Sequence, residues 1–350
     1  MVNTENLLFV FPGARQQHLD RIEVVEKLGS HKVDVLFGFG QEYGISTAPK
    51  NFHEMKNSWS VCKKIKKIMP EIIFIAGWYH WLSITSIFTA LYLRIPICIM
   101  SESTLHEQSS NIFKKFIKRL LMSSAKCFLV GGVAQNEQVR YYIKSPQIKI
   151  FHGYNSKKID RYNKHSNEKL YNLFVGQLTK KKNVDVIIDA YHLLVLDGYK
   201  IRPLHIVGDG PLRKQLEDKV IDLKLDKSII FEGSKFGDEL IQKYNAAYVT
   251  IIPSLYEQWP FVSVESLASG TPIILSETVG CFELCKHAIL STGLTFNPTS
   301  ARELCQTIKL IDMADYDKLS ENCLITIKPY DAKHMFKESV EKIISIYSKS

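Results

Sequence analysis

The sequence predicts an α/β protein built from two doubly wound domains, each with a parallel sheet covered by helices. Short apolar runs alternate with longer helical patterns along the whole chain, and continuous runs of this kind are typical of strands that are buried on both faces. A polar stretch at residues 152–169, rich in charge and turn formers, divides this alternation into two halves. The 350 residues give each half enough chain to bury a core of its own.

Five strands are expected in the first half and six in the second. Those of the first half are residues 7–11, 33–39, 72–76, 97–100 and 127–130. Those of the second half are residues 170–176, 203–208, 228–233, 248–253, 271–275 and 293–296. Right-handed crossovers between parallel strands place helices on the faces of each sheet. The N-terminal domain is expected at residues 1–155 and the C-terminal domain at 156–330.

The net charge of +9 lies almost wholly in the N-terminal half. Residues 1–155 hold 19 Lys and Arg against 11 Asp and Glu, a difference of +8, whereas residues 156–350 hold 26 against 25. Two basic clusters occur, at 63–67 and 114–119. Such clusters attract nucleic acid, anionic lipid headgroups or phosphorylated substrates, and they are equally compatible with solvated helix faces.

The seven cysteines predict reduced thiols in a cytoplasmic protein. Their number is odd, and they are scattered without a CxxC motif or histidines at metal-ligand spacing. Cys281 and Cys285 are close in sequence, but no second pair accompanies them, so no metal site is predicted. The opening residues lack the long apolar run of a secretory signal peptide.

One uncharged segment, Ile72–Leu93, is long enough to span a bilayer. It contains Gly77, His80 and several hydroxyl side chains, however, and it divides naturally into a strand, a loop and a helix. We therefore expect a buried part of the N-terminal domain, with a transmembrane helix as the alternative.

Ligands of open α/β sheets bind beyond the carboxyl ends of the strands, so the residues that follow each strand are candidates for a site. After the strand at 248–253, Pro260 suits the first turn of a helix and Gly270 suits its end. Glu257 then lies in the loop and Glu265 inside the helix. The positive helix terminus would form an anion site from the free N–H groups of Phe261, Val262 and Ser263.

Residues 254–272, SLYEQWPFVSVESLASGTP, resemble the E-x7-E element of family 4 retaining glycosyltransferases with the GT-B fold. Three further stretches match motifs of that family in the same order. Residues 176–183 resemble its G-R-L-x-x-x-K-G phosphate loop, 208–212 its GDGP turn, and 277–283 its T-x-x-G-x-x-E turn. Each motif is weak alone, but their order and spacing between residues 170 and 307 make the resemblance specific.

The resemblance implies two Rossmann-like domains that face each other across a cleft, with a C-terminal helix at 331–350 crossing back to the first domain. It also implies a hexosyl- or N-acetylhexosaminyltransferase that takes its sugar from a UDP- or GDP-sugar and retains the anomeric configuration. No metal or other cofactor is expected. The C-terminal domain would bind the nucleotide sugar, and the N-terminal domain would bind the acceptor.

The family pattern also implies roles for the matching residues of this chain. Glu257 would orient the transferred sugar, Glu265 would hold the ribose, and Lys182 would neutralise the diphosphate. The remaining donor-binding positions are Gly13, Gln177, Gly208, Gly210, Pro211, Leu212, Pro260, Phe261, Val262 and Ser263. Neither carboxylate is expected to be a glycosidase-type nucleophile, because such a pair flanks one glycosidic bond. We expect a front-face mechanism, in which the leaving phosphate takes the acceptor proton.

Three departures from the family pattern bear on function. Gln177 stands where the family has an arginine, and an amide lacks the guanidinium fork, so Lys182 would carry more of the diphosphate charge. Asn183 replaces a glycine, and the histidine that usually follows the fourth strand of the N-terminal domain is missing. The absent arginine and histidine leave open a catalytically silent module that binds a nucleotide sugar or a partner enzyme.

The N-terminal half matches the family less closely. Of the glycine loop that follows the first strand, Gly13 remains. Glu102, which follows the strand at 97–100, is the candidate catalytic group facing the sugar or the acceptor; a carboxylate that only favours a helix N-terminus is the alternative. Aromatic faces suit sugars, although the same rings can be core residues. The candidate acceptor-binding residues are Arg15, Trp78, Tyr79, His80, Ser103 and His106.

Residues 111–122 have apolar side chains at helical spacing with Lys and Arg between them. In the family such helices can dock enzymes on membranes that carry polyprenyl-linked acceptors; a helix that packs its apolar stripe on the sheet is the alternative. The expected partners are a nucleotide sugar, a glycan or polyprenyl-diphosphate-linked acceptor and an anionic membrane surface. Aromatic-basic strand motifs are absent, which argues against nucleic-acid binding. The resemblance thus implies a cytoplasmic enzyme of polysaccharide or lipopolysaccharide synthesis, peripheral at the inner face of the membrane.

Overall fold

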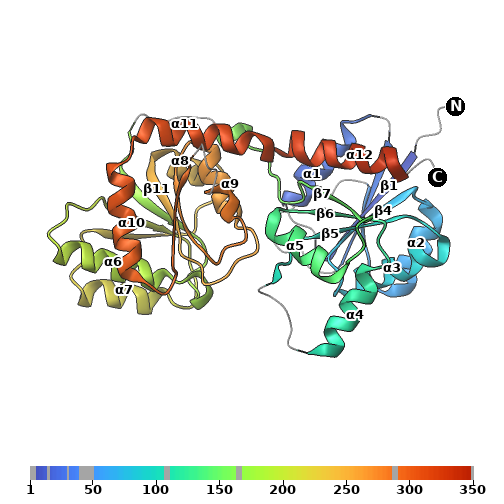
Figure 1. Cartoon of the computed structure of the whole chain (residues 1–350), viewed down its shortest axis with the longest axis horizontal. Helices are drawn as coiled ribbons and strands as arrows, with labels where there is room; N and C mark the ends of the chain where they lie inside the picture. The colour runs from blue at the N-terminus through green and yellow to red at the C-terminus, as the bar shows by residue number, and fades with distance from the viewer. Residues whose placement is uncertain are drawn as a thin grey trace. The chain divides into compact units, whose positions relative to one another are not determined.

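Backbone contacts divide the chain into two units. The first consists of Met1–Lys158 together with Tyr330–Ser350, and the second consists of Ile159–Pro329. Within them, the computed structural model describes residues 5–13, 16–29, 31–38, 51–105, 111–162, 168–285 and 291–347. The chain thus completes the second unit and then returns to the first with its C-terminal segment (Figure 1).

Within the described residues, the first unit contains a seven-stranded parallel sheet in the order β3-β2-β1-β4-β5-β6-β7. Its strands are β1 (Glu5–Phe11), β2 (His31–Phe37), β3 (Phe52–Glu54), β4 (Ile72–Ala76), β5 (Ile97–Ser101), β6 (Cys127–Val130) and β7 (Lys149–His152). All five strands predicted for this half are present. The sequence does not predict β3 and β7, because these short strands carry partly exposed side chains rather than an apolar run.

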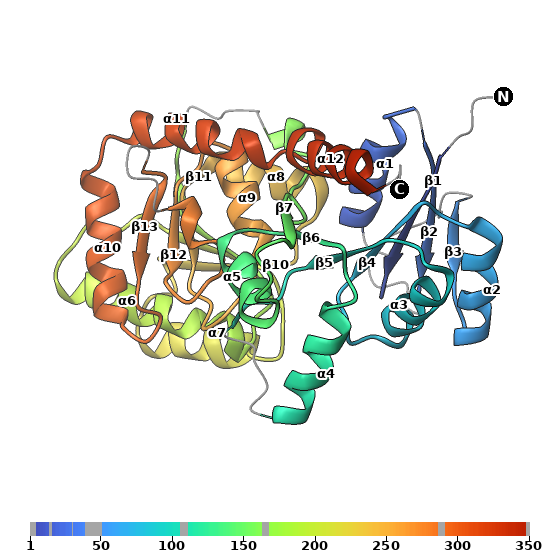
Figure 2. The same cartoon turned by 45° about the vertical axis from the view of Figure 1, so that its right-hand side comes forward.

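Helices cover both faces of this sheet, so the first unit is doubly wound as predicted. One face packs against α1 (Gln16–Glu26) and α12 (Lys337–Tyr347), which lie side by side (Figures 1 and 2). The other face packs against α2 (Ser58–Ile68), α3 (Trp81–Leu93), α4 (Ile112–Met122) and α5 (Val133–Tyr142). A short π-helical turn, Ala332–Phe336, leads into α12.

The uncharged segment 72–93 forms β4, a loop and α3, as the sequence predicts. Residues of β4 and α3 are buried in the core of the first unit. In the part of the chain that the structure describes, no helix is long and apolar enough to cross a membrane.

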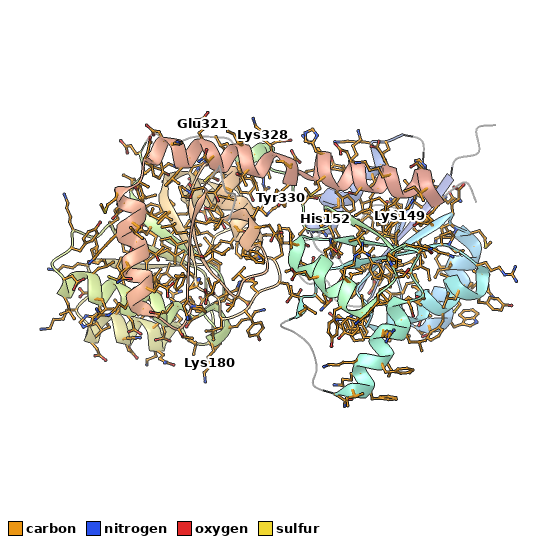
Figure 3. The ribbon with its side chains drawn as sticks, viewed as in Figure 1. Lys149, His152, Lys180, Glu321, Lys328 and Tyr330 are labelled. Carbon is orange, nitrogen blue, oxygen red and sulfur yellow. The ribbon has the colours of Figure 1, made fainter. Side chains whose placement is uncertain are left out.

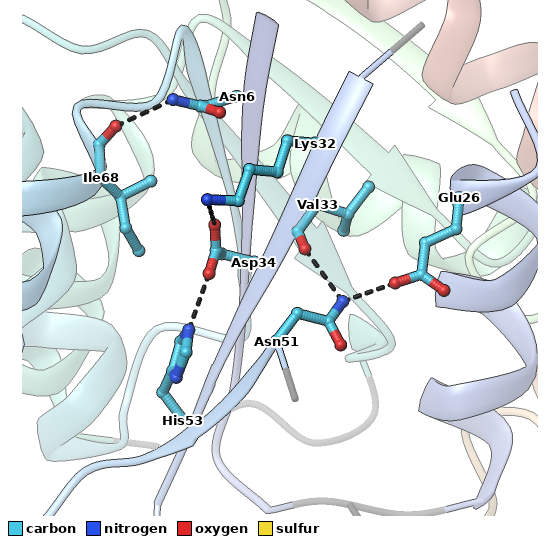
Figure 4. Close-up of polar contacts among 8 residues, drawn as sticks. All are labelled: Asn6, Glu26, Lys32, Val33, Asp34, Asn51, His53 and Ile68. Atoms are coloured by element: carbon cyan, nitrogen blue, oxygen red, sulfur yellow. Dashed lines mark hydrogen bonds and ion pairs between the residues drawn. The ribbon is translucent and has the colours of Figure 1, made fainter. Parts of the chain in front are cut away.

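Side-chain hydrogen bonds hold the edge strand β3 against β2 (Figure 4). His53 Nε2 lies 2.7 Å from Asp34 Oδ1, and Asn51 Nδ2 donates to the Val33 carbonyl at 2.9 Å. Asp34 is buried, so its carboxylate needs such partners. Polar contacts therefore stabilise a strand that has little apolar surface of its own.

The second unit contains a six-stranded parallel sheet in the described residues, in the order β10-β9-β8-β11-β12-β13. All six predicted strands are present, as β8 (Tyr171–Val175), β9 (Leu204–Val207), β10 (Ile229–Gly233), β11 (Ala247–Ile252), β12 (Ile273–Ser276) and β13 (Gly293–Phe296).

This second sheet is also covered on both faces. Val249 and Ile251 of β11 point into the core beneath α6 (Val184–Leu196), α7 (Arg213–Asp222) and α10 (Ala301–Met313). The intervening Thr250 points the other way and accepts a hydrogen bond from Ser266 at 2.8 Å. The helices associated with that opposite face are α8 (Gly237–Ala246), α9 (Phe261–Ala268) and α11 (Tyr316–Ile327). The predicted fold class, two doubly wound Rossmann-like domains, is therefore confirmed.

Candidate functional site

The glycine loops that follow β8 and β9 are in backbone contact at the carboxyl ends of their strands. Leu178 N donates to the Asp209 carbonyl at 2.9 Å. Gly208 has φ 140°, and a Cβ atom there would lie 1.8 Å from the Gly176 carbonyl oxygen. Only glycine fits such an approach. The predicted donor-binding residue Gly208 thus has a packing requirement independent of any ligand.

The other predicted residues of the second loop lie beside this contact. A Cβ atom at Gly210 would lie 2.6 Å from the Leu178 carbonyl oxygen, so this glycine is also required by the packing. Leu212 packs half-buried against the core of the unit, whereas Pro211 and Gln177 are exposed at the surface of the two loops. Pro211 and Gln177 are therefore among the exposed residues of these loops.

Lys182 and Glu257 form an ion pair where the loops after β8 and β11 meet. Lys182 Nζ donates to Glu257 Oε1 at 2.6 Å and to Oε2 at 2.7 Å. Both side chains are less than a fifth exposed, so the pair is weakly screened by water. The sequence predicts each residue in the site but not their direct contact.

Backbone contacts of the 277–283 turn fix the position of Glu257. Glu257 and Val279 form an isolated parallel bridge, and Gly280 N donates to the Glu257 carbonyl at 2.8 Å. Ser254 Oγ adds a hydrogen bond of 2.9 Å to Glu257 Oε2. The 254–272 motif contains Ser254, but the sequence predicts no role for it; its place three residues before the carboxylate is the signal that could identify it.

The three consecutive lysines before α6 have different surroundings. The 3₁₀ turn Lys180–Lys182 leaves Lys180 exposed (Figure 3). Lys181 Nζ lies 4.6 Å from the centroid of the Tyr256 ring, within cation–π range. Lys182 alone of the three reaches Glu257, so it is the lysine of this run that the fold directs to the site.

Asn183 explains how the chain tolerates the loss of the family's glycine. Its φ of 53° and ψ of 43° are left-handed, a conformation that asparagine adopts more readily than most residues. Asn183 Nδ2 also donates to the Pro253 carbonyl at 3.2 Å and to the Pro298 carbonyl at 2.8 Å. The substitution therefore keeps the loop geometry and ties it to the loops after β11 and β13.

Helix α9 begins at Phe261 after Pro260, as the sequence predicts. The expectation of three free N–H groups is wrong at Ser263, because Ser263 N donates to the Pro260 carbonyl at 3.1 Å. The Ser263 hydroxyl donates to the same carbonyl at 2.7 Å, since a serine in the first turn folds back on the chain before it. One of the three N–H groups expected to meet an anion at this terminus is therefore already engaged within the chain.

Glu265 is buried within α9 and accepts hydrogen bonds from two tyrosines. Tyr244 Oη donates to Oε2 at 2.7 Å, and Tyr162 Oη donates to Oε1 at 3.2 Å. Burial and the neighbouring charge of Glu265 raise the pKa of Tyr244 well above its ordinary value. No sequence motif contains these tyrosines, so sequence reasoning missed them.

The described part of the first unit includes Gly13, Glu102 and Ser103, which are predicted as a donor-binding, a catalytic and an acceptor-binding residue, respectively. Gly13 has open space where a Cβ would lie, and Glu102 is half-buried, its carbonyl accepting from Gln135 Nε2 at 3.3 Å. Ser103 follows it in the same loop and is also half-buried. Arg15 and His106 lie outside the described residues.

The aromatic residues of the loop after β4, Trp78, Tyr79 and His80, differ in how exposed their side chains are. Tyr79 is 71% exposed. Trp78 is half-buried, with Lys118 Nζ 5.2 Å from its ring centroid. His80 is the N-cap of α3 and accepts from Leu82 N at 3.3 Å, and burial lowers its pKa below the ordinary value. His80 therefore has a structural role whether or not it meets an acceptor.

No cluster of three or more His, Cys, Asp or Glu suited to a metal occurs among the described residues. At the carboxyl edge of the second sheet, the Lys182–Glu257 pair and the Ser254 hydroxyl lie in the loops that lead towards the start of α9. Such a set can bind an anion and the hydroxyl groups of a sugar without a metal.

Part of the chain that includes this edge is similar to a family of known proteins. Residues 155–323 match the family of glycosyl transferases group 1. The chain is similar to an uncharacterized glycosyltransferase of Methanocaldococcus jannaschii, at 37% identity over 33% of this chain and 30% of the relative. A second such protein of that organism matches at 25% identity over 73% of this chain and 70% of the relative. An O-antigen chain mannosyltransferase of Salmonella typhimurium matches at 24% identity over 57% and 55%.

Solved structures share the fold of the whole chain. A glycosyltransferase from Rickettsia africae aligns with TM-score 0.77 and 17% identity, covering 99% of this chain and 100% of that one. A protein from Anabaena, solved in complex with UDP, aligns with TM-score 0.78 and 15% identity, covering 98% and 100%. At these identities the likeness shows the fold alone.

Proposed function

Residues 155–323 form a domain of the glycosyl transferases group 1 family, and from this premise we propose that the protein is a retaining glycosyltransferase. It transfers a hexosyl or N-acetylhexosaminyl group from a UDP- or GDP-sugar to a glycan or lipid-linked acceptor. The observation that carries the proposal is the Lys182–Glu257 pair, 2.6 Å apart beside the start of α9. An adjacent ammonium and carboxylate suit a donor that presents a diphosphate next to sugar hydroxyls.

In the proposed reaction the bond between the anomeric carbon and the donor phosphate breaks, and the acceptor oxygen bonds to the same face of the sugar. The acceptor proton passes to the leaving phosphate. Negative charge grows on that phosphate, so a preformed ammonium and helix terminus stabilise the transition state more than the ground state. Lys182 has three N–H donors, of which Glu257 uses two, and the third is available to a phosphate oxygen.

Glu257 and Glu265 have separate roles in this proposal. Glu257 orients hydroxyl groups of the transferred sugar, since Ser254, Lys182 and the Gly280 amide hold it in one position. Glu265 binds the ribose from within α9. Gly13 and Glu102 of the first unit contact the donor or the acceptor, and Ser103 and Tyr79 contribute to the acceptor surface.

We propose that the acceptor side of the protein also meets an anionic membrane surface through α4. The apolar side chains of this helix are divided: Leu121 and Met122 are buried, whereas Ile112, Phe113, Phe116 and Leu120 are each at least 59% exposed. The expected packing of the whole stripe on the sheet is therefore incomplete. Exposed apolar groups with interspersed Lys114, Lys115 and Arg119 suit the headgroup region of an anionic bilayer.

A panel of UDP, GDP, ADP and their sugars, added to the purified protein in a thermal-shift assay, tests the proposed function. A nucleotide that binds the folded state raises the melting temperature by mass action. Lys182→Ala should abolish the shift, whereas the matched variant Lys180→Ala, which removes an exposed lysine of the same turn, should retain it. The proposal fails if no nucleotide shifts the wild-type protein.

The competing function is a catalytically silent module that binds the nucleotide sugar, favoured by the exposed Gln177 in place of an arginine. Donor hydrolysis and transfer to a mixture of glycan acceptors distinguish the two. Binding without either activity, under conditions that retain the thermal shift, would favour the module.

A further inference from the structure

The buried carboxylate of Glu265 is a second constrained polar group of the second unit, apart from the Lys182–Glu257 pair. Glu265 is 8% exposed, and the two tyrosines that donate hydrogen bonds to it, Tyr162 and Tyr244, are at most 1% exposed. Their rings pack edge to face with centroids 6.4 Å apart. A carboxylate taken out of water at this depth needs strong hydrogen bonds to remain charged.

Three separate elements bring these groups together. Glu265 lies in α9, Tyr244 lies in α8, and Tyr162 ends the 3₁₀ turn Asp160–Tyr162. Neither tyrosine is near Glu265 in sequence, at separations of 103 and 21 residues. The arrangement is therefore a tertiary feature rather than a local cap of α9.

Each of the two tyrosine hydroxyls binds a different oxygen of the Glu265 carboxylate. One donates to Oε1 and the other to Oε2, so rotation of the carboxylate plane would break both bonds. A carboxylate oxygen can accept more than one hydrogen bond, so binding of a ribose hydroxyl does not require either tyrosine bond to break. Because the hydroxyl of Tyr244 keeps its proton in this environment, it acts as a donor throughout the physiological pH range.

We propose that Tyr162 and Tyr244 are positioning residues that aim the Glu265 carboxylate at the ribose hydroxyls of the donor nucleotide. The inference rests on the proposed function and adds two residues that set its preference for ribose. Tyr244 has the larger effect because its hydrogen bond is shorter by half an ångström, 2.7 Å against 3.2 Å.

Isothermal titration of UDP, GDP and ADP against their 2′-deoxy and 3′-deoxy counterparts tests the assignment. The wild-type protein should bind the ribose form of its nucleotide more tightly than at least one deoxy form, by about tenfold, as for a hydrogen bond to a charged group. Tyr244→Phe keeps the ring and removes the hydroxyl, so this ratio should fall to about one. Tyr162→Phe should lower the ratio less.

Tyr248→Phe is the matched control, because it removes another buried tyrosine hydroxyl of the same unit. Tyr248 Oη donates to the Ile311 carbonyl at 3.3 Å and has no part in the proposed site. This variant should change the melting temperature without changing the ratio. The ratio thus separates a positioning role from a merely structural one.

The outcomes are distinguishable. If the wild-type protein binds none of these nucleotides, the proposed function and the inference fail together. If it binds them with a ribose preference that both Tyr→Phe variants at 162 and 244 retain, the inference alone is wrong. The inference is also overturned if Tyr248→Phe lowers the affinity ratio as much as Tyr244→Phe does. The same holds if the wild-type protein binds the ribose and deoxy forms equally well.

Discussion

Lys182 and Glu257 are separated by 75 positions in the chain and lie 2.6 Å apart in the fold. Their charges are mutually compensating, so neither side chain is left as an isolated buried ion. Glu257 is further held by Ser254 and by the turn at Val279. At the scale of single residues, the proposed site is thus preorganised before any donor binds, a condition for electrostatic stabilisation of a leaving phosphate.

Substitution of the two carboxylates should separate catalysis from binding. Glu257→Gln keeps the shape but loses the charge that orients the sugar, so kcat should fall by about a hundredfold while nucleotide affinity largely remains. Glu265→Gln should raise the nucleotide Kd by about tenfold. Steady-state kinetics and titration calorimetry measure the two effects.

Glu277→Gln provides the control for both variants, because Glu277 is an exposed carboxylate in the turn adjacent to Glu257. It should leave kcat and Kd unchanged. The role assignment would be overturned by the reverse pattern, in which Glu257→Gln weakens nucleotide binding and Glu265→Gln affects only turnover.

Helix α4 differs from the other helices of the first sheet in how much apolar surface it leaves in water. Ile112 is 82% exposed, and Phe113 and Phe116 are each more than 60% exposed. Its N-terminus is capped by Asn111, which accepts from Phe113 N at 2.9 Å, so the helix is well formed despite this exposure. Apolar groups in a stable, basic helix are an interaction surface at the scale of one element.

Loss of the exposed rings should reduce membrane binding without loss of fold. The double change Phe113→Ser and Phe116→Ser should lower co-sedimentation with phosphatidylglycerol vesicles by about tenfold or more, because each ring contributes burial in the headgroup region. The control is Leu196→Ser in the second unit, where an exposed leucine lies on α6. Equal sedimentation of all three proteins would contradict the proposal.

Lys169 lies just before β8, and its contribution to the stability of the fold depends on pH. Its Nζ donates to the Asn245 carbonyl at 2.7 Å, and burial lowers its pKa from 10.5 to about 8. The unfolded chain therefore binds this proton more tightly than the folded chain does. It follows that the contribution of Lys169 to the free energy of unfolding increases as the pH rises from about 8 to 10.5.

Lys169→Met removes this titration and should reveal it. The melting temperature of the variant minus that of the wild type should be higher near neutral pH than at about pH 10, because the wild-type protein carries a poorly solvated charge at the lower pH. Differential scanning calorimetry at the two pH values measures the difference. A constant difference would show that Lys169 does not titrate in this range.

At the scale of the whole molecule, the described residues form two sheets with separate cores, and the C-terminal segment is assigned to the first unit. Phe336, Val340 and Ile343 are fully buried beside residues of β1 and β4. The buried face of the segment Ala332–Tyr347 therefore belongs to the core of the first unit, and its packing should affect the first unit more than the second.

A buried change in α12 should destabilise one unit selectively. Ile343→Ala should cost about 2–5 kcal/mol, as for other large-to-small core changes, and should increase hydrogen exchange in β1 and α1 but not in β8 or β11. Ile346→Ala, at a more exposed position of the same helix, should have little effect. Increased exchange throughout both sheets would contradict this division.

Much of the fold could be predicted from the sequence, because strands buried on both faces of a parallel sheet must be apolar along their length. The runs at 72–76 and 248–253 are examples, and both form central strands. The short edge strands β3 and β7 could not be predicted in this way, since polar contacts and register hold them. The loops that form the site can also be predicted from the sequence, because the carboxyl ends of parallel strands lie at one edge of the sheet.

The sequence by itself determined the order of the elements, the class of the fold and the chemical types at the site, since these depend on local pattern and on motif spacing. Only the tertiary structure decided which side chains meet: Lys182 with Glu257, and Tyr162 and Tyr244 with Glu265. The physical reason is that these partners come from separate elements, and their distances depend on how the strands are ordered and how each helix is rotated against the sheet.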